Sequence, residues 1–197
     1  MQFTRDLLIF IMVFFCCQIA QAENYFFPKQ QLSFGFYDND FITANPWRPS
    51  SPFFWTATTK ADGGGTIVYT RTLYHTQKYF SAEWGVAGSI WTMNGQSSIG
   101  AFSALIQLRW WIFRTDYFNP YVVYSIAGPS LLTRDTFGPA QLTAPFIFQD
   151  YLGVGTFFGK DHHFDLSARM YHYSNGDLLT HNPGFDVPLV IFFGFNF

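Results

Sequence analysis

The segment 164-FDLSARMYHYS-174 alternates apolar and polar side chains with a period of two residues. Its apolar face consists of Phe164, Leu166, Ala168 and Met170. The opposite face carries Asp165, Ser167, Arg169 and Tyr171. Successive side chains of a β-strand point to opposite faces, so the pattern predicts a strand with one apolar face. In a soluble barrel or sandwich that face would point inward, whereas in a membrane barrel it would contact lipid.

The same alternation recurs in segments 80–90 and 102–112, whose polar faces include Glu83 and Arg109. The patterns predict strands over residues 31–38, 65–75, 79–92, 98–113, 119–133, 145–158, 163–174 and 186–197. Strands of about ten residues suit a tilted crossing of a bilayer. The triple glycine Gly63-Gly64-Gly65 lacks the helix and lysine of a phosphate-binding loop, and we interpret it as a flexible loop.

Composition favours the membrane alternative. Only 12% of the 197 residues are charged, which is about half the share typical of soluble domains, and 22% are aromatic. No stretch after residue 22 is long and apolar enough for a transmembrane helix. Backbone groups in lipid must all be paired, so without helices only a closed sheet can span the bilayer. We therefore predict an all-β fold, an eight-stranded antiparallel transmembrane β-barrel.

The expected links between strands alternate in length. Links 76–78, 114–118 and 159–162 are short, whereas 39–64, 93–97, 134–144 and 175–185 are mostly longer and richer in Gly, Pro, Asn and Ser. This alternation predicts short periplasmic turns, longer external loops and both termini in the periplasm. Side chains fill a barrel this narrow, so Glu83, Arg109 and Arg169 are expected to neutralise one another inside it.

The first 22 residues have the pattern of a secretory signal peptide. Arg5 precedes an apolar run from Leu7 to Cys17, and Ala20-Gln21-Ala22 ends the segment before Glu23. The expected domains are thus a signal peptide over 1–22 and a barrel over 23–197. Both cysteines lie in the signal segment, so the exported chain would have no disulfide. The net charge of −2 provides no basic surface for nucleic acid.

His172 and Ser174 continue the apolar, lipid-facing row of segment 164–174. Polar groups on the outer wall of a barrel are costly in hydrocarbon, so they are candidates for a functional site. A histidine can take the proton of a nearby serine, and a carboxylate can orient the histidine. Asp186, across the last external loop, could be that carboxylate, although strict alternation places it inward unless Pro188 marks a bulge. The alternative is a polar barrel rim without chemistry.

At these residues the sequence resembles the lipid A 3-O-deacylases of Gram-negative outer membranes, the PagL family. That family carries a C-terminal His-x-Ser-Asn segment followed by a carboxylate fourteen positions after the histidine. Here His172-Tyr173-Ser174-Asn175 matches this segment, and Asp186 stands where the family usually has glutamate. The family's glycine two positions after the asparagine is absent, and Gly176 stands one position early.

The resemblance implies an outer-membrane esterase that hydrolyses the 3-O-linked hydroxyacyl chain of lipid A from an active site facing the outer leaflet. Ser174 would be the nucleophile, His172 the general base and acid, and Asp186 the orienting carboxylate. Asn175 would help to bind the oxyanion of the intermediate, and Gly176 would lie beside it in the oxyanion- or substrate-binding part of the site. The implied partners are lipid A, as substrate, and membrane lipid, without a metal or an organic cofactor.

Other functions stay open at this point. An outer-membrane phospholipase or acyltransferase is the competing enzyme, and a structural or adhesive barrel is the non-catalytic alternative. The oligomeric state is also open. His162 and His163 could suggest a metal site, but we interpret them as solvated residues of a short turn.

Overall fold

The structure is a computed structural model of the chain. It describes residues 25–40, 55, 57, 59–93, 97–137, 140–141, 144–176, 178 and 184–197. The expected signal peptide, residues 1–22, lies outside the described residues. No helix in these ranges is long and apolar enough to span a membrane.

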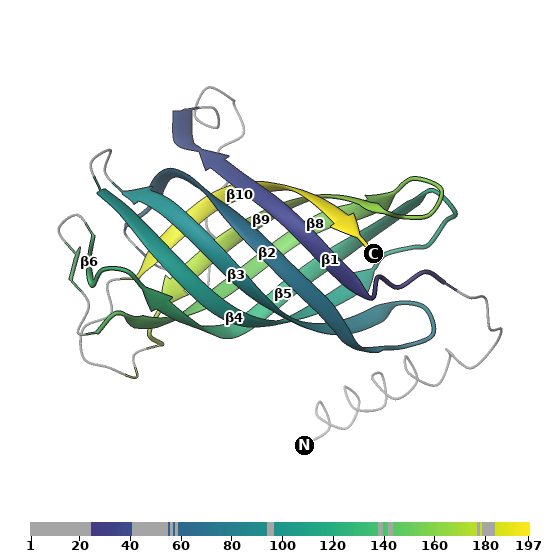
Figure 1. Cartoon of the computed structure of the whole chain (residues 1–197), viewed down its shortest axis with the longest axis horizontal. Coiled ribbons are helices and arrows are strands. Elements are labelled where there is room, and N and C mark those ends of the chain that lie inside the picture. Colours follow the sequence, from purple (N-terminus) through teal and green to yellow (C-terminus); the bar gives the residue numbers. More distant parts are fainter. Residues whose placement is uncertain are drawn as a thin grey trace, which may run out of the picture.

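Eight long antiparallel strands form a closed barrel in the order β1-β10-β9-β8-β5-β4-β3-β2 (Figure 1). They are β1 (Gln30–Asp38), β2 (Ala61–His75), β3 (Phe80–Met93), β4 (Ser97–Trp111), β5 (Phe118–Leu132), β8 (Phe146–Phe158), β9 (Phe164–Ser174) and β10 (Phe185–Asn196). A short hairpin, β6 (Thr136–Phe137) and β7 (Ala140–Gln141), stands apart from the barrel in the β5–β8 link. The predicted eight-stranded barrel and its strand positions are therefore confirmed.

One local prediction is wrong. Gly63, Gly64 and Gly65 belong to β2 and pair with Asp38, Tyr37 and Phe36 of β1, so they are not a flexible loop. Gly64 has a φ of 138°, and a Cβ atom there would lie 2.1 Å from the carbonyl oxygen of Ile90. The glycines therefore allow close approach of two backbones within the sheet.

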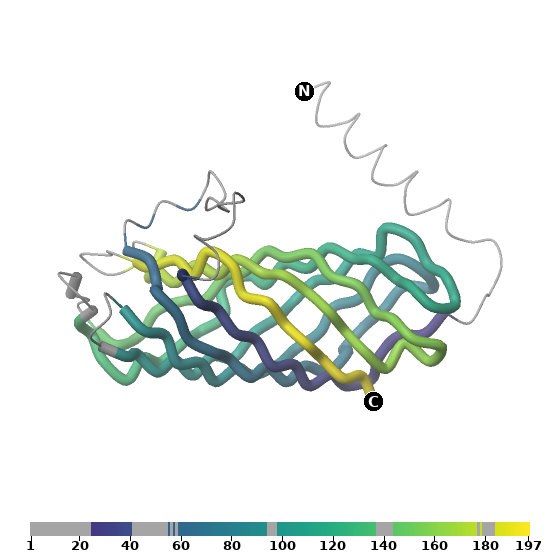
Figure 2. Tube along the Cα trace, turned by 90° about the horizontal axis from the view of Figure 1, so that it is seen from above, coloured from purple at the N-terminus to yellow at the C-terminus, as the bar shows by residue number. Residues whose placement is uncertain are grey.

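The strands are inclined and wrap a single tube, and the links between them gather at its two ends (Figure 2). The short links 76–79, 112–117 and 159–163 lie at one end, which we call the short-link end. At the other end, which we call the long-link end, β1, β3, β5 and β9 finish and β2, β4, β8 and β10 begin. The last residues of β9 and the first residues of β10 therefore belong to the long-link end.

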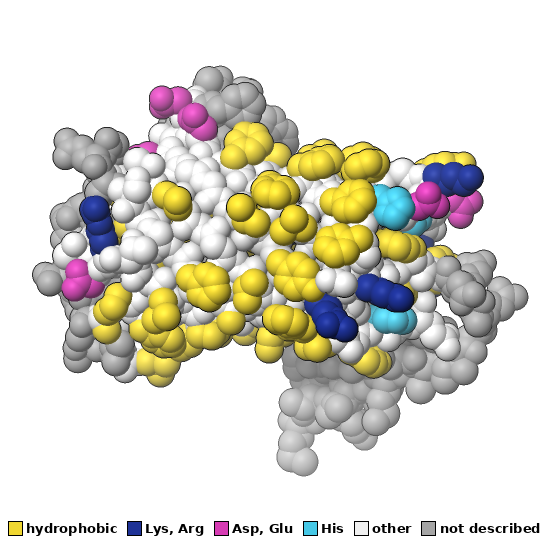
Figure 3. All heavy atoms as spheres, viewed as in Figure 1, with side chains coloured by type: hydrophobic (Ala, Val, Ile, Leu, Met, Phe, Trp, Pro, Cys, Tyr) yellow, Lys and Arg dark blue, Asp and Glu magenta, His cyan; other side chains and the backbone are white. Residues whose placement is uncertain are grey.

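The outer wall of the barrel is apolar. Hydrophobic side chains cover its middle, and charged side chains and histidines gather toward the ends (Figure 3). In β9, the outward residues Phe164 and Leu166 are 41% and 50% exposed, whereas Asp165 and Arg169 are buried inside. This arrangement is the reverse of that in a soluble barrel, because the outer wall of a membrane barrel faces lipid rather than water.

Inside the barrel, Glu83 and Arg109 are paired as predicted, whereas Arg169 pairs with Asp165, which the prediction did not include. Arg109 donates to Glu83 at 3.2 Å and to the side-chain oxygen of Gln31 at 2.9 Å. Glu83 also accepts hydrogen bonds from Ser81 at 2.8 Å and from Gln107. These side chains are all buried, so their charges must be compensated within the barrel.

The second buried arginine is paired more loosely. The Arg169 guanidinium lies 3.9 Å from the carboxylate of Asp165 and 4.2 Å from the centre of the Phe192 ring. Asp165 also accepts a 2.5 Å hydrogen bond from the hydroxyl of Tyr121. With both arginines and their aromatic neighbours in place, the interior is a packed core.

Removing one partner of the Glu83–Arg109 pair should destabilise the barrel strongly. Arg109→Met leaves the Glu83 carboxylate buried without its cation, which is expected to cost about 3–5 kcal/mol in the free energy of unfolding. Urea unfolding of the barrel in lipid vesicles, followed by the gel mobility of the folded form, measures this loss.

The matched control is Arg71→Met, because Arg71 is exposed on β2 and should be nearly neutral. The double variant Glu83→Gln with Arg109→Met should be more stable than Arg109→Met alone. Equal stability of the Arg109 and Arg71 variants would contradict the importance of the buried pair.

Candidate functional site

His172 and Ser174 lie on the outer face of β9, at its long-link end. The two side chains follow Ala168 and Met170 in the outward row, as the alternation predicts, and both are partly exposed. Two polar groups thus stand in a row that is otherwise made of apolar residues. They depart from the rule that governs the rest of the strand.

A bulge in β10 brings Asp186 onto the same face. Asp186 pairs with His172 and Val187 with Tyr171, but Val190 pairs with Arg169. Two residues of β10 therefore oppose one residue of β9, and the parity of the strand changes by one. Pro188 lies in this irregular stretch, where its missing N–H group breaks no regular pairing. The bulge expected near Pro188 is confirmed.

The same bulge makes one prediction wrong. Strict alternation along β10 predicts that Val187 points outward, toward lipid. Val187 is instead fully buried and lies opposite the inward-facing Tyr171, because it precedes the extra residue. Leu189, after Pro188, resumes the expected parity and is partly exposed.

His172 and Asp186 form a short hydrogen bond, with 2.7 Å between His172 Nδ1 and Asp186 Oδ1. A carboxylate only accepts, so Nδ1 carries the proton and Nε2 is left with its lone pair. Asp186 is 1% exposed, and the side chain of His172 is 12% exposed. Shielding from solvent strengthens such a bond and fixes the imidazole ring. The arrangement is that of a base held by a carboxylate.

Ser174 lies beside this pair but is not joined to it. Side chains two residues apart on one strand face are separated by roughly 7 Å at their Cα atoms. Within the described part of the chain, no hydrogen bond connects the Ser174 hydroxyl to His172. Hydrogen bonds between a nucleophile and its base are often long before substrate binds, so this separation is compatible with chemistry.

Asp150 is a second carboxylate at the site, and the sequence analysis missed it. It lies on β8 directly opposite His172, and it is partly exposed on the outer face. Its carboxylate accepts a 2.5 Å hydrogen bond from the backbone N–H of Ala127, whose φ is 45°. The sequence does contain a sign of its role. Asp150 interrupts the outward row of Phe146, Phe148 and Leu152, just as His172 interrupts the outward row of β9.

Asn175 and Gly176 begin the link that follows Ser174. Asn175 is buried, and its carbonyl oxygen accepts a hydrogen bond from the N–H of Leu178 at 3.2 Å. Gly176 is exposed with a φ of 61°, a left-handed conformation that suits glycine. The two residues therefore form a turn next to the serine.

The link between β1 and β2 returns to this site. The indole of Trp55 stacks on the imidazole of His172, with ring centroids 5.4 Å apart and planes 10° apart. The carbonyl oxygen of Thr59 accepts the N–H of Asp186 at 3.0 Å, and Lys60 forms a parallel bridge with Asp186. Neither the sequence pattern nor the strand order predicts this contact, because it depends on the path of a long link.

His162 is not a solvated turn residue, contrary to the prediction. It is 8% exposed, and its Nε2 lies 3.1 Å from the side-chain nitrogen of Asn119. Burial lowers the pKa of His162, which favours the neutral ring that can accept this hydrogen bond. His163 is exposed. No group of three His, Cys, Asp or Glu side chains suited to a metal ion occurs among the described residues.

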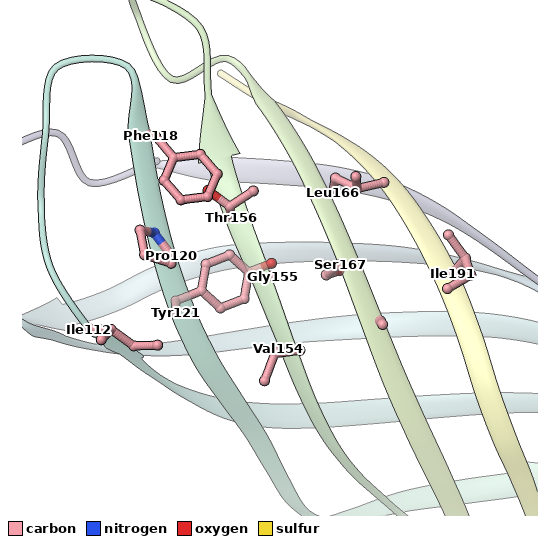
Figure 4. Close-up of a pocket in the computed structure, with 11 residues that line it drawn as sticks. Ile112, Phe118, Pro120, Tyr121, Val154, Gly155, Thr156, Leu166, Ser167 and Ile191 are labelled. Carbon is pink, nitrogen blue, oxygen red and sulfur yellow. The ribbon is translucent and has the colours of Figure 1, made fainter. Parts of the chain in front are cut away.

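An apolar hollow lies on the same wall, toward the short-link end. Leu166 and Ala168 of β9 line it together with residues of β5, β8 and β10 and with Ile112, which follows β4 (Figure 4). Ala168 precedes His172 by four residues, a distance of roughly 13 Å along the strand. The hollow is thus separate from the polar site but belongs to the same lipid-facing surface.

Two comparisons with known protein sequences point to the same family. The family model described as lipid A 3-O-deacylase (PagL) matches residues 53–194. The lipid A deacylase PagL of Bordetella bronchiseptica is 27% identical over 128 residues, which cover 60% of this chain and 67% of the relative.

The fold also matches that of a solved protein. The crystal structure of the outer membrane enzyme PagL superposes with a TM-score of 0.58 at 16% sequence identity, covering 85% of this chain and 99% of that one. At this identity the likeness concerns the fold alone. The match of the family model over well more than half of the chain is the stronger observation, and it shows that the chain belongs to the lipid A 3-O-deacylase (PagL) family.

Proposed function

We propose that this protein is a serine-dependent esterase that removes the 3-O-linked hydroxyacyl chain of lipid A. Family membership supports the substrate and the hydrolase class. The observation that carries the mechanism is the 2.7 Å hydrogen bond between His172 and Asp186, two residues from Ser174 on the outer wall. A carboxylate-oriented imidazole beside a hydroxyl is the arrangement that activates a serine.

In the first step, His172 Nε2 takes the proton of Ser174 as Oγ attacks the ester carbonyl carbon. The new C–O bond gives a tetrahedral oxyanion, and Asp186 stabilises the imidazolium that forms. His172 then returns the proton to the sugar oxygen at position 3 as the original ester bond breaks. The acyl chain stays on Ser174, and the deacylated lipid leaves.

In the second step, water replaces the sugar. His172 removes a proton from the water, the hydroxide attacks the acyl-serine, and the proton passes to Ser174 Oγ as the fatty acid departs. Asn175 and Gly176, in the turn after Ser174, are the candidates for binding the oxyanion in both steps. Preorganised donors at this position usually contribute a large part of the rate enhancement.

We further propose that cleavage of the signal peptide after Ala22 accompanies export, and that the long-link end of the barrel faces outward. The site would then lie at the depth of the outer leaflet, where lipid A resides. Lipid A would reach Ser174 by lateral diffusion, with its acyl chains along the apolar wall. A site on the outside of a filled barrel is compatible with this route, because no interior pocket is required.

Replacing the proposed nucleophile should abolish deacylation. Lipid A from cells that express the intact protein should lose the mass of one 3-hydroxyacyl chain, because Ser174 carries the acyl intermediate. Lipid A from cells that express Ser174→Ala should keep its full mass. Mass spectrometry of lipid A extracted from the two strains measures this difference.

The control is the folded state of both proteins in the outer membrane, followed by gel mobility. A mass loss with Ser174→Ala as well would exclude Ser174 as the nucleophile. Unchanged lipid A in both strains, with new lysophospholipids in the intact strain only, would instead identify an outer-membrane phospholipase.

The two carboxylates beside His172 should differ in importance. Asp186→Asn removes the acceptor of the Nδ1 proton and is expected to reduce kcat by a factor on the order of 10²–10⁴. Asp150→Asn is the matched variant, and its effect should be much smaller, since the Asp150 carboxylate accepts the N–H of Ala127 and not the imidazole proton. Deacylation rates of purified variants in lipid A micelles provide the comparison.

Asp186→Glu completes this series, because it keeps the acceptor while it changes the reach of the side chain. It should retain far more activity than Asp186→Asn. If Asp150→Asn is less active than Asp186→Asn, Asp150 rather than Asp186 orients His172, and the assignment proposed here is wrong.

A further inference from the structure

The described residues of the β1–β2 link cover the polar site from outside the barrel. We call Trp55, Ala57, Thr59 and Lys60 the strap residues. Trp55 is 8% exposed although it belongs to a link rather than to a strand. Its indole lies nearly parallel to the ring of His172, at 5.4 Å between centroids. One face of the imidazole is therefore covered by an aromatic ring and not by lipid.

The strap is fixed to the site by its backbone. Asp186 donates its N–H to the carbonyl oxygen of Thr59 at 3.0 Å, and Lys60 continues this contact as a parallel bridge. A methyl group placed on Gly184 would lie 3.6 Å from both Ala57 Cβ and Ser174 Cβ, so the strap also passes close to the serine. Contacts at all four strap positions thus converge on Asp186, His172 and the surroundings of Ser174.

We propose that Trp55 is a positioning residue for His172, an inference that rests on the proposed esterase activity. The Asp186 hydrogen bond fixes the Nδ1 edge of the imidazole, but a single hydrogen bond still lets the ring tilt about its Cβ–Cγ bond. The indole face removes this freedom by packing flat against the ring. Nε2 is then held in one direction, on the outer face of β9 that also carries Ser174 two residues further along.

The stacking has a second consequence during the reaction. His172 becomes an imidazolium when it takes the serine proton, and the face of an indole attracts a cation within about 6 Å of its centre. Trp55 therefore favours the charge that appears in the transition state. Its contribution belongs to the chemical step rather than to the binding of lipid A.

The test compares Trp55→Ala and Trp55→Phe with the intact protein. Trp55→Ala should lower kcat by roughly 2- to 30-fold with little change in KM, the range that corresponds to a lost cation–π contact. Trp55→Phe keeps an aromatic face and should recover most of the rate. Trp84→Ala is the matched control, because Trp84 is an exposed tryptophan on the wall of β3, away from the site.

A second measurement is independent of the lipid substrate. A fluorophosphonate probe reacts with an activated serine, and its rate of attachment to Ser174 reports on the base. This rate should fall in Trp55→Ala and be largely restored in Trp55→Phe, whereas Ser174→Ala should not be labelled. All variants are compared as folded barrels in detergent, checked by gel mobility.

The outcomes separate the two proposals. If the intact protein deacylates lipid A and Trp55→Ala has the same kcat and labelling rate, the positioning role is wrong and the proposed function stands. A raised KM with unchanged kcat would also overturn it, because Trp55 would then bind lipid. If Trp55→Phe is as slow as Trp55→Ala, an aromatic face is not what His172 requires. Absence of both deacylation and labelling in the intact protein would instead overturn the proposed function.

Discussion

The requirement that every backbone group in lipid be paired decides both the fold and the place of the site. It closes the sheet, and the closed sheet has one filled interior and one lipid-facing wall. In the part of the chain that the structure describes, the interior is packed with Arg109, Arg169 and their partners, as expected for a barrel this narrow. Polar chemistry must therefore be built on the wall, where each polar side chain replaces an apolar one. His172, Ser174, Asp186 and Asp150 are such replacements, and they cluster at one end of adjacent strands.

The bulge in β10 is the device that makes this cluster possible. A carboxylate on β10 can meet His172 only from a position of the same parity, and regular pairing from Val190 onward would turn Asp186 inward. One extra residue next to Pro188 changes the parity without opening the barrel, because the pairing resumes on both sides. The interruption lies at the strand end, where the loss of one ladder contact destabilises the sheet least. The site is thus obtained by a local irregularity in an otherwise regular wall.

Sequence periodicity predicts those features that depend on one strand alone. The strands, the outward direction of His172 and Ser174, and the irregularity near Pro188 could be derived in this way. The opposition of Asp150 and His172 could not, because it depends on the register between β8 and β9. The position of Trp55 requires the path of a long link, and periodicity carries no information about it. The triple glycine was misinterpreted because glycine is equally typical of flexible loops and of close backbone approach.

Charge balance explains why such a site can exist against lipid. Asp186 is buried, its carboxylate accepts the Nδ1 proton of His172, and its backbone N–H donates to Thr59 of the strap. In the proposed reaction, a proton moves from Ser174 to His172, which creates one positive and one negative charge at neighbouring atoms. The total charge of the site does not change, so no net charge has to be desolvated as the barrier is crossed. A medium of low dielectric strengthens the attraction between these new charges, and the lipid-facing wall thereby favours the transition state once the polar groups are held in place.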